Sequence, residues 1–112
     1  MKTITNQVQL IGNLGTDPEI RETANNGKTA RMRLATNEDY RSAAGAIVKR
    51  THWHNLRATG RQAELAETLL KKGYEVAVAG KLVHTHYTDK AGLKRHFTVI
   101  EIAEIQIMGN RA

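Results

Sequence analysis

The sequence predicts an all-β fold, a five-stranded Greek-key barrel with one α-helix between the third and fourth strands. Three observations predict this fold class. Apolar and polar residues alternate with a period of two through several runs, turns that contain glycine separate these runs, and a single segment has the composition of a helix. With 112 residues the chain is long enough for one domain with its own core, which we assign to residues 1–112.

Two turns and one alternating run define the first strands. Residues 25–27 (NNG) and 44–45 (AG) are typical of hairpin turns. Between them, residues 30–34 (ARMRL) place their apolar side chains on one face and Arg31 and Arg33 on the other, as in a half-buried antiparallel strand. Both arginines are therefore expected to point outward.

One segment breaks the strand pattern. Residues 61–72 (RQAELAETLLKK) consist of strong helix formers, with acidic residues early, two lysines in the predicted last turn and Gly73 placed to cap the end. Four apolar residues share one side of the predicted helix: Leu65, Ala66, Leu69 and Leu70. The segment is therefore expected to be a single amphipathic helix.

Residues 74–82 resume the alternation and predict a strand with a bend. Val76, Val78 and Leu82 fall on its buried side. Gly80 stands where a barrel strand bends sharply, because a strand glycine often marks a bend or a close approach of two backbones.

The last strand follows a turn at residues 89–92 (DKAG) and changes phase near its end. Two pairs of isoleucines have opposite parity: Ile100 with Ile102, and Ile105 with Ile107. A β-bulge around residues 103–104 explains this shift, and such bulges turn the corners of barrels. The order strand, strand, strand, helix, strand, strand is that of the OB fold. An open sheet covered by one helix is the alternative.

Composition narrows the classes of function. The 17 Lys+Arg residues against 11 Asp+Glu give a net charge of +6, which suits an anionic partner, nucleic acid more often than an acidic membrane surface. The lack of cysteine excludes disulfides, Cys-ligated zinc, iron–sulfur clusters and a thiol nucleophile. The sequence has neither an apolar signal-peptide region nor an 18-residue apolar run, so we expect a soluble cytoplasmic protein without membrane contact.

The strand around the only tryptophan carries the clearest functional pattern. By alternation Trp53, Asn55 and Arg57 share one face, while Leu56 and Ala58 take the other. An outward tryptophan in line with an arginine is a platform on which bases stack while the cation holds phosphate. The alternative is a tryptophan packed in the core; its shared parity with Arg57 favours the outward position.

Two tyrosines lie near predicted hairpin tips, in basic or polar surroundings. Tyr40 and Tyr87 are either further stacking platforms or strand-end side chains that cover a barrel mouth. Tyr74 and Phe97 are assigned to core or rim packing.

The five histidines are candidate metal ligands: the pairs His52/His54 and His84/His86, and His96. Residues i and i+2 of a strand share a face, so two such pairs on adjacent strands would supply four ligands to zinc. Strand histidines more often serve in packing or at interfaces, and no carboxylate stands at metalloprotease spacing. We therefore predict no metal site.

The remaining candidates for catalysis carry no motif. Ser42, the only serine, lacks the surroundings of a nucleophile. Residues 12–15 (GNLG) do not form a nucleotide-binding loop and are interpreted as a tight turn. The sequence thus predicts neither an enzyme nor a bound cofactor.

Longer stretches of the chain resemble a known family. Residues 8–19 (VQLIGNLGTDPE) are similar to the opening segment of the bacterial single-stranded DNA-binding proteins. The similarity continues in order through residues 34–38, 51–54, 61–73, 76–82 and 87–89. This resemblance implies a homotetramer of OB folds that binds and protects single-stranded DNA without regard to sequence, in replication, recombination and repair at the bacterial nucleoid.

The resemblance also implies roles for individual residues. The positions that match the family's base-stacking aromatics are Tyr40, Trp53 and Tyr87. Those that match or lie close to its phosphate contacts are Arg57, Arg61 and Lys72. Four further cations are predicted from charge and parity alone: Arg31, Arg33, Lys49 and Arg50. His54 matches a position near the subunit interface, and Thr59 stands where the family has another aromatic, so that contact is expected to be missing.

The sequence departs from the family at its C-terminus. Members commonly continue into a linker and an acidic tip that recruits other proteins, whereas this sequence stops at Ala112, so partners recruited through a tail are not expected. Three alternatives stay open: a dimeric primosomal replication accessory protein of the same fold, a histidine-ligated metal hydrolase, and a purely structural oligomer.

Overall fold

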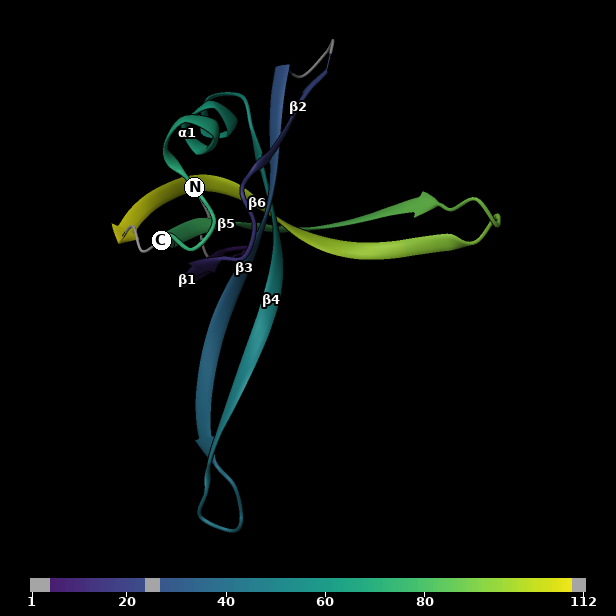
Figure 1. The fold of residues 1–112 in the computed structure, drawn as a ribbon. Coiled ribbons are helices and arrows are strands. Elements are labelled where there is room, and N and C mark those ends of the chain that lie inside the picture. The colour runs from purple at the N-terminus through teal and green to yellow at the C-terminus, as the bar shows by residue number, and fades with distance from the viewer. Residues whose placement is uncertain (1–4, 24–26, 110–112) are drawn as a thin grey trace.

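The computed structural model describes residues 5–23 and 27–109, so residues 25 and 26 of the first predicted turn lie outside the described residues. The elements follow the chain in this order: β1 (Val8–Leu14), β2 (Glu19–Thr23), β3 (Gly27–Arg41), β4 (Ile47–Thr59), α1 (Arg61–Leu69), β5 (Glu75–Thr88) and β6 (Lys94–Gly109) (Figure 1). Within these described residues no helix is long and apolar enough to cross a membrane.

The strands close into a barrel. The sheet order is β1-β5-β6-β4-β3-β2, and a further pairing of β1 with β3 joins the two ends, leaving β2 as an extension beside β3. All pairs are antiparallel except β4 with β6. The closure confirms the predicted five-stranded Greek-key OB barrel with its helix between the third and fourth barrel strands. The open sheet is wrong, because β1 pairs with both β5 and β3.

Closure of the barrel depends on a close approach at Gly12. A Cβ atom there would lie 2.1 Å from the carbonyl oxygen of Ala35 on β3, so a larger residue does not fit. The interpretation of residues 12–15 as a tight turn is wrong, since β1 continues through this segment to Leu14.

Two hairpins extend beyond the barrel as arms. The β3–β4 arm runs to the pair Arg41 and Ile47, and the β5–β6 arm to the pair Thr88 and Lys94. Figure 1 shows them pointing in different directions. The predicted turns at 44–45 and 89–92 are confirmed at the tips of these two arms.

The core combines strand side chains with two alanines of the helix. Leu34, Leu56 and Val76 are the largest fully buried side chains, and Ala63 and Ala66 of α1 pack against them. Alanine lets the helix axis come close to β3, β4 and β6, the strands that α1 contacts.

The helix differs from the prediction in where it ends and in which of its residues are buried. It ends at Leu69, and Leu70 turns into the core in an extended conformation, so Lys71 and Lys72 lie beyond the last turn. Leu65 and Leu69 are exposed. The reason is tertiary: only small side chains fit between the helix and the barrel, so the leucines point away from it.

The predicted bulge is confirmed in β6. Ala79 pairs with Glu104 and Gly80 with Ile102, which leaves Ala103 without a partner on β5. Gly80 has the close approach expected of a strand glycine, since a Cβ atom there would lie 2.0 Å from the carbonyl oxygen of Glu101. Val76 and Val78 are buried as predicted.

Leu82 contradicts the predicted buried side of this strand. Its side chain is 41% exposed, because the pairing of β5 with β1 ends at Gly80 and β5 then continues with β6 into the β5–β6 arm (Figure 1).

Candidate nucleic-acid interface

One outward face of the sheet collects the tryptophan and several arginines. In the β3–β4 register Arg31 lies opposite Arg57, Arg33 opposite Asn55, and Ala35 opposite Trp53. Residues directly opposite one another share a face of the sheet. The residues on either side of Arg57 along β4, Leu56 and Ala58, are buried. The predicted parity is confirmed, and the alternative of a core tryptophan is wrong, because Trp53 is 50% exposed.

The indole of Trp53 is held in place by two neighbours. The guanidinium carbon of Arg33 lies 4.8 Å from the centroid of the ring, within the range of a cation–π interaction. On the ring's Cζ3–Cη2 edge lies Gly15, where a Cβ atom would come within 2.3 Å of Cζ3. The ring therefore keeps a defined orientation while half of its surface stays open to a ligand.

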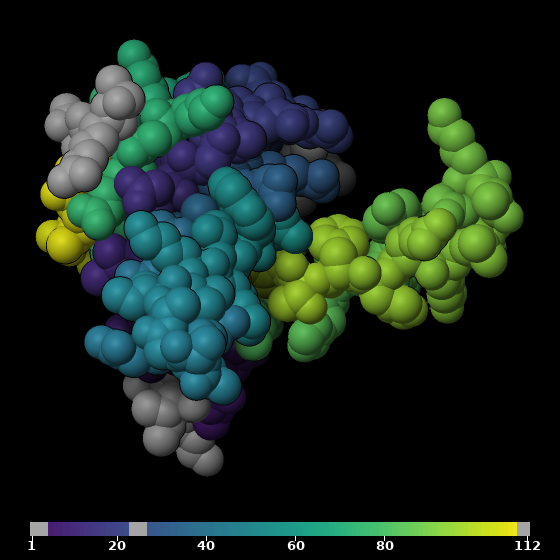
Figure 2. Space-filling model, turned by 60° about the horizontal axis from the view of Figure 1, so that its bottom comes forward, coloured from purple at the N-terminus to yellow at the C-terminus, as the bar shows by residue number. Residues whose placement is uncertain are grey.

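A groove of about 630 Å³ runs from this face to the β5–β6 arm. The arm stands away from the rest of the molecule (Figure 2) and forms one wall with Tyr87 and Phe97, whose rings pack edge to face at 5.8 Å. Tyr87 is 54% exposed. The charged side chains that line the groove are four arginines and two carboxylates, Arg31, Arg33, Arg57, Arg95, Asp17 and Glu19, so cations predominate.

Tyr40 lies elsewhere. It pairs with Val48 near the end of the β3–β4 arm, and the register places it on the face of Glu38 and His54, opposite to Trp53. Arg50 lies over the tyrosine ring, 5.1 Å from its centroid, and donates a hydrogen bond to the hydroxyl at 3.1 Å. The structure thus separates the pair Tyr40–Arg50 from the groove.

Three other predicted cations also lie away from the groove lining. Lys49 shares the face of Trp53, but it pairs with Asp39 further along the arm. Arg61 begins α1 and Lys72 follows its end; both are exposed. The backbone N–H of Lys72 donates to Oδ1 of Asp17 at 2.8 Å, which ties this loop to the segment after β1.

His54 has a structural partner on the face opposite to Trp53. Its Nε2 lies 2.9 Å from the hydroxyl of Thr36. Partial burial, and then the neighbouring His52, lower the pKa of His54 below its ordinary value, so the neutral ring is favoured. Its role at a subunit interface stays a prediction.

The histidine pairs do not meet. His52 and His54 lie on β4 and His84 and His86 on β5, and β6 runs between these two strands. The four-ligand arrangement considered for zinc is therefore wrong. In the parts of the chain that the structure describes, no group of three or more His, Asp or Glu residues is placed to hold a metal ion.

Comparison with known proteins identifies the family. The model of the single-strand binding protein family matches residues 5–108. The chain belongs to this family. The Single-stranded DNA-binding protein 1 of Chlorobaculum tepidum is 39% identical over 105 residues, which cover 93% of this chain and 65% of that relative. The chain therefore spans about two thirds of the relative's length, and the resemblance seen in residues 8–19 is confirmed.

Solved structures of single-strand binding proteins share the fold. The Plasmodium falciparum SSB in complex with ssDNA has a TM-score of 0.85 at 24% identity and covers 96% of this chain and 98% of its own. The small single-stranded DNA-binding protein from Streptomyces coelicolor has a TM-score of 0.72 at 28% identity and covers 96% and 95%.

Two residues that line the groove were missed by sequence reasoning. Phe97 was assigned to packing, and Arg95 had no assigned role; both line the groove beside Tyr87. A signal was available. The turn at residues 89–92 fixes the register in which Tyr87 faces Arg95, and alternation then places Phe97 on the same face.

Proposed function

We propose that this chain binds single-stranded DNA without regard to sequence and without catalysis, and so protects it during replication, recombination and repair. One observation carries the proposal: the half-exposed ring of Trp53 shares an outward sheet face with Arg31, Arg33 and Arg57, beside a groove walled by Tyr87. Aromatic faces stack bases of any kind at about 1–3 kcal/mol each, while cations follow the phosphates. The names of the relatives from Chlorobaculum tepidum and Streptomyces coelicolor support the same ligand.

The proposal assigns roles to both faces of the β3–β4 arm. Trp53 stacks a base beside the groove and Tyr87 stacks one at its wall. Tyr40 stacks a base on the opposite face, which a continuous DNA strand reaches by passing around the arm. Cations outside the groove hold phosphates along the way: Lys49, Arg50, Arg61 and Lys72. We further propose that residues 1–112 act as a single OB domain in a cytoplasmic homotetramer, with His54 near its interface.

Titration with poly(dT) and with duplex DNA, followed through Trp53 fluorescence at low and high salt, tests this function. We expect quenching by the single strand, with an affinity whose logarithm falls by about 0.7 per neutralised phosphate for each tenfold rise in salt. The absence of both quenching and salt-sensitive binding would overturn the proposal. The mass in solution separates a tetramer from the dimer of the accessory-protein alternative.

Gly15→Ala tests whether the orientation of Trp53 matters for binding. The new Cβ atom would lie 2.3 Å from Cζ3 of the ring, so the ring must move. We expect a shifted emission maximum and a loss of single-strand affinity of about tenfold, within the 1–3 kcal/mol that one stacked base contributes. Gly109→Ala is the matched control, because its Cβ meets no atom nearer than 3.8 Å. Equal affinities of the two variants would contradict the expectation.

A further inference from the structure

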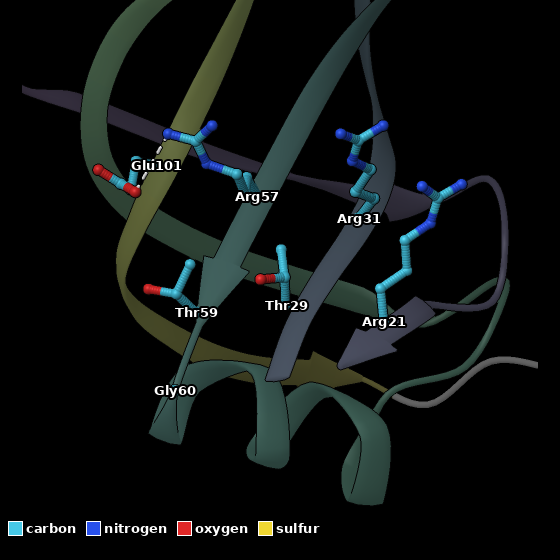
Figure 3. Close-up of a pocket in the computed structure, with 7 residues that line it drawn as sticks. All are labelled: Arg21, Thr29, Arg31, Arg57, Thr59, Gly60 and Glu101. Carbon is cyan, nitrogen blue, oxygen red and sulfur yellow. Dashed lines mark hydrogen bonds and ion pairs between the residues drawn. The ribbon is translucent and has the colours of Figure 1, made fainter. Parts of the chain in front are cut away.

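A second pocket adjoins the groove, and arginines from three neighbouring strands line it. This arginine pocket, of about 620 Å³, is formed by Arg21 of β2, Arg31 of β3, Arg57 of β4 and Glu101 of β6. Figure 3 shows the three arginines rising from the same side of the strands. Arg31 and Arg57 line both the pocket and the groove, so the two hollows are adjacent.

The charges of the pocket are unbalanced. Three arginines and one glutamate line it, which leaves two net positive charges. Arg31 lies directly opposite Arg57, an arrangement of like charges that costs stability in a sheet. Glu19 of β2 also lies opposite Arg31, but its carboxylate accepts a hydrogen bond from Arg21 at 3.2 Å. Among the residues that the structure describes, Arg31 has no ion-pair partner.

Glu101, the only carboxylate that lines the pocket, does not accept hydrogen bonds from all the buried donors of Arg57. Only one guanidinium nitrogen of Arg57 bonds Glu101, at 3.2 Å, and the buried Nε of Arg57 has no partner in the described structure. Arginine binds oxyanions best through two parallel hydrogen bonds. Glu101 is also shared with Lys81, whose Nζ lies 4.0 Å from the other carboxylate oxygen. The contact is therefore one that a better-placed anion can replace.

Uncharged donors complete the pocket. Thr29 and Thr59 lie opposite each other on β3 and β4 and both line it. Gly60, the residue before α1, lines it as well, which puts the positive end of the helix dipole at its edge. Arginines, hydroxyls and a helix start are groups that recognise a phosphate.

We propose that the arginine pocket is a phosphate subsite of the DNA groove, and that Glu101 occupies it in the free protein. A backbone phosphate of the bound strand displaces the Glu101 carboxylate from Arg57 and pairs with Arg57 and Arg31 together. The inference rests on the proposed function. It makes Glu101 a built-in competitor of DNA, so the free protein holds its basic surface in a partly neutralised state.

Glu101→Gln removes the competing charge and keeps the size of the side chain. We expect this variant to bind a (dT) oligomer about two- to fivefold more tightly than the wild type at low salt, the effect of one partly exposed ion pair. Arg31→Gln should bind more weakly and lower the slope of log affinity against log salt by about 0.7, the share of one single-strand phosphate. Fluorescence anisotropy of a labelled oligomer at several salt concentrations measures both.

Glu104→Gln is the matched control, since it makes the same change of charge on β6 but lines a different hollow with Leu10 and Val78. An equal gain from both glutamine variants would assign the effect to net charge and overturn the subsite. If Glu101→Gln and Arg31→Gln both bind the oligomer with the affinity of the wild type, the subsite is overturned but the proposed function is not. A wild type that binds no single strand at all overturns the proposed function together with it.

Inorganic phosphate offers the same chemistry as a phosphate of the DNA backbone, and two further experiments distinguish these two ligands. With an oligomer whose linkages are neutral methylphosphonates, we expect the gain from Glu101→Gln to disappear. We expect inorganic phosphate to compete with the oligomer no better than chloride at the same ionic strength. Stronger competition by phosphate, with no gain from Glu101→Gln, would assign the pocket to a free anion and overturn the proposal.

Discussion

Replacing Trp53 by alanine should weaken the binding of a (dT) oligomer by about 1–3 kcal/mol for each base that stacks on the ring, or about 5- to 150-fold for one base. The barrel should stay folded, because the ring is 50% exposed and its removal opens no cavity in the core. The substitution also frees the guanidinium of Arg33 from its cation–π contact, but leaves its charge in the groove. Salt dependence should therefore change much less than affinity.

Anisotropy of a labelled oligomer is the right measurement, since Trp53→Ala removes the only tryptophan of the chain. Trp53→Phe should keep most of the affinity, because a smaller ring still stacks. Leu65→Ala serves as a matched control, since it removes an exposed apolar side chain from α1, away from the groove. Wild-type affinity in a folded Trp53→Ala protein would remove this residue from the site.

The outward position of Trp53 was predictable because alternation is a local property of a strand. Trp53, Asn55 and Arg57 must share a face wherever β4 is regular, and the register shows no shift along this hairpin. The bulge at Ala103 was predictable for the same reason, because the change of parity between the two isoleucine pairs indicates one extra residue in the strand between them.

The position of Tyr40 was not predictable in the same way. Its face follows from alternation along β3 only if that strand runs without a break from Arg33 to Tyr40, whereas the sequence predicts an alternating run over residues 30–34 alone. Tyr40 resembles a stacking residue by its place in the sequence, but the register sets it opposite to Trp53.

The helix shows a second limit of sequence reasoning. Its pattern placed four large or small apolar residues on one side, but burial depends on the surface that receives them. The barrel surface accepts Ala63 and Ala66 and excludes Leu65 and Leu69. Glu101 was missed for a similar reason, because its importance comes from a parallel pairing with Arg57 across the sheet and not from any local motif.

Gly80→Ala should be among the most destabilising single changes in this chain that add only one methyl group. Its Cβ atom would lie 2.0 Å from the carbonyl oxygen of Glu101 and 3.1 Å from the Cα atom of Ile102, both backbone atoms that no side-chain rotation can move. Relief requires β5 and β6 to separate beside the bulge, where the barrel turns. We expect a loss of about 1–3 kcal/mol or more, the usual cost of overpacking. Denaturation by urea with and without DNA measures it.

Gly109→Ala tests whether that loss comes from the close approach and not from adding a methyl group to a strand glycine. Gly109 lies at the end of β6 and pairs with Glu75 on β5, but the nearest atom to its Cβ is a flexible carboxylate oxygen at 3.8 Å. Both substitutions restrict the unfolded chain equally, and this contribution alone is stabilising. The Gly109→Ala protein should therefore be as stable as the wild type or slightly more stable. A Gly80→Ala protein as stable as the wild type would show that the contact between β5 and β6 is less tight than the geometry requires. Because Glu101 provides both the carbonyl that Gly80 accommodates and the carboxylate that faces Arg57, a separation of these strands should also withdraw the carboxylate from the arginine pocket.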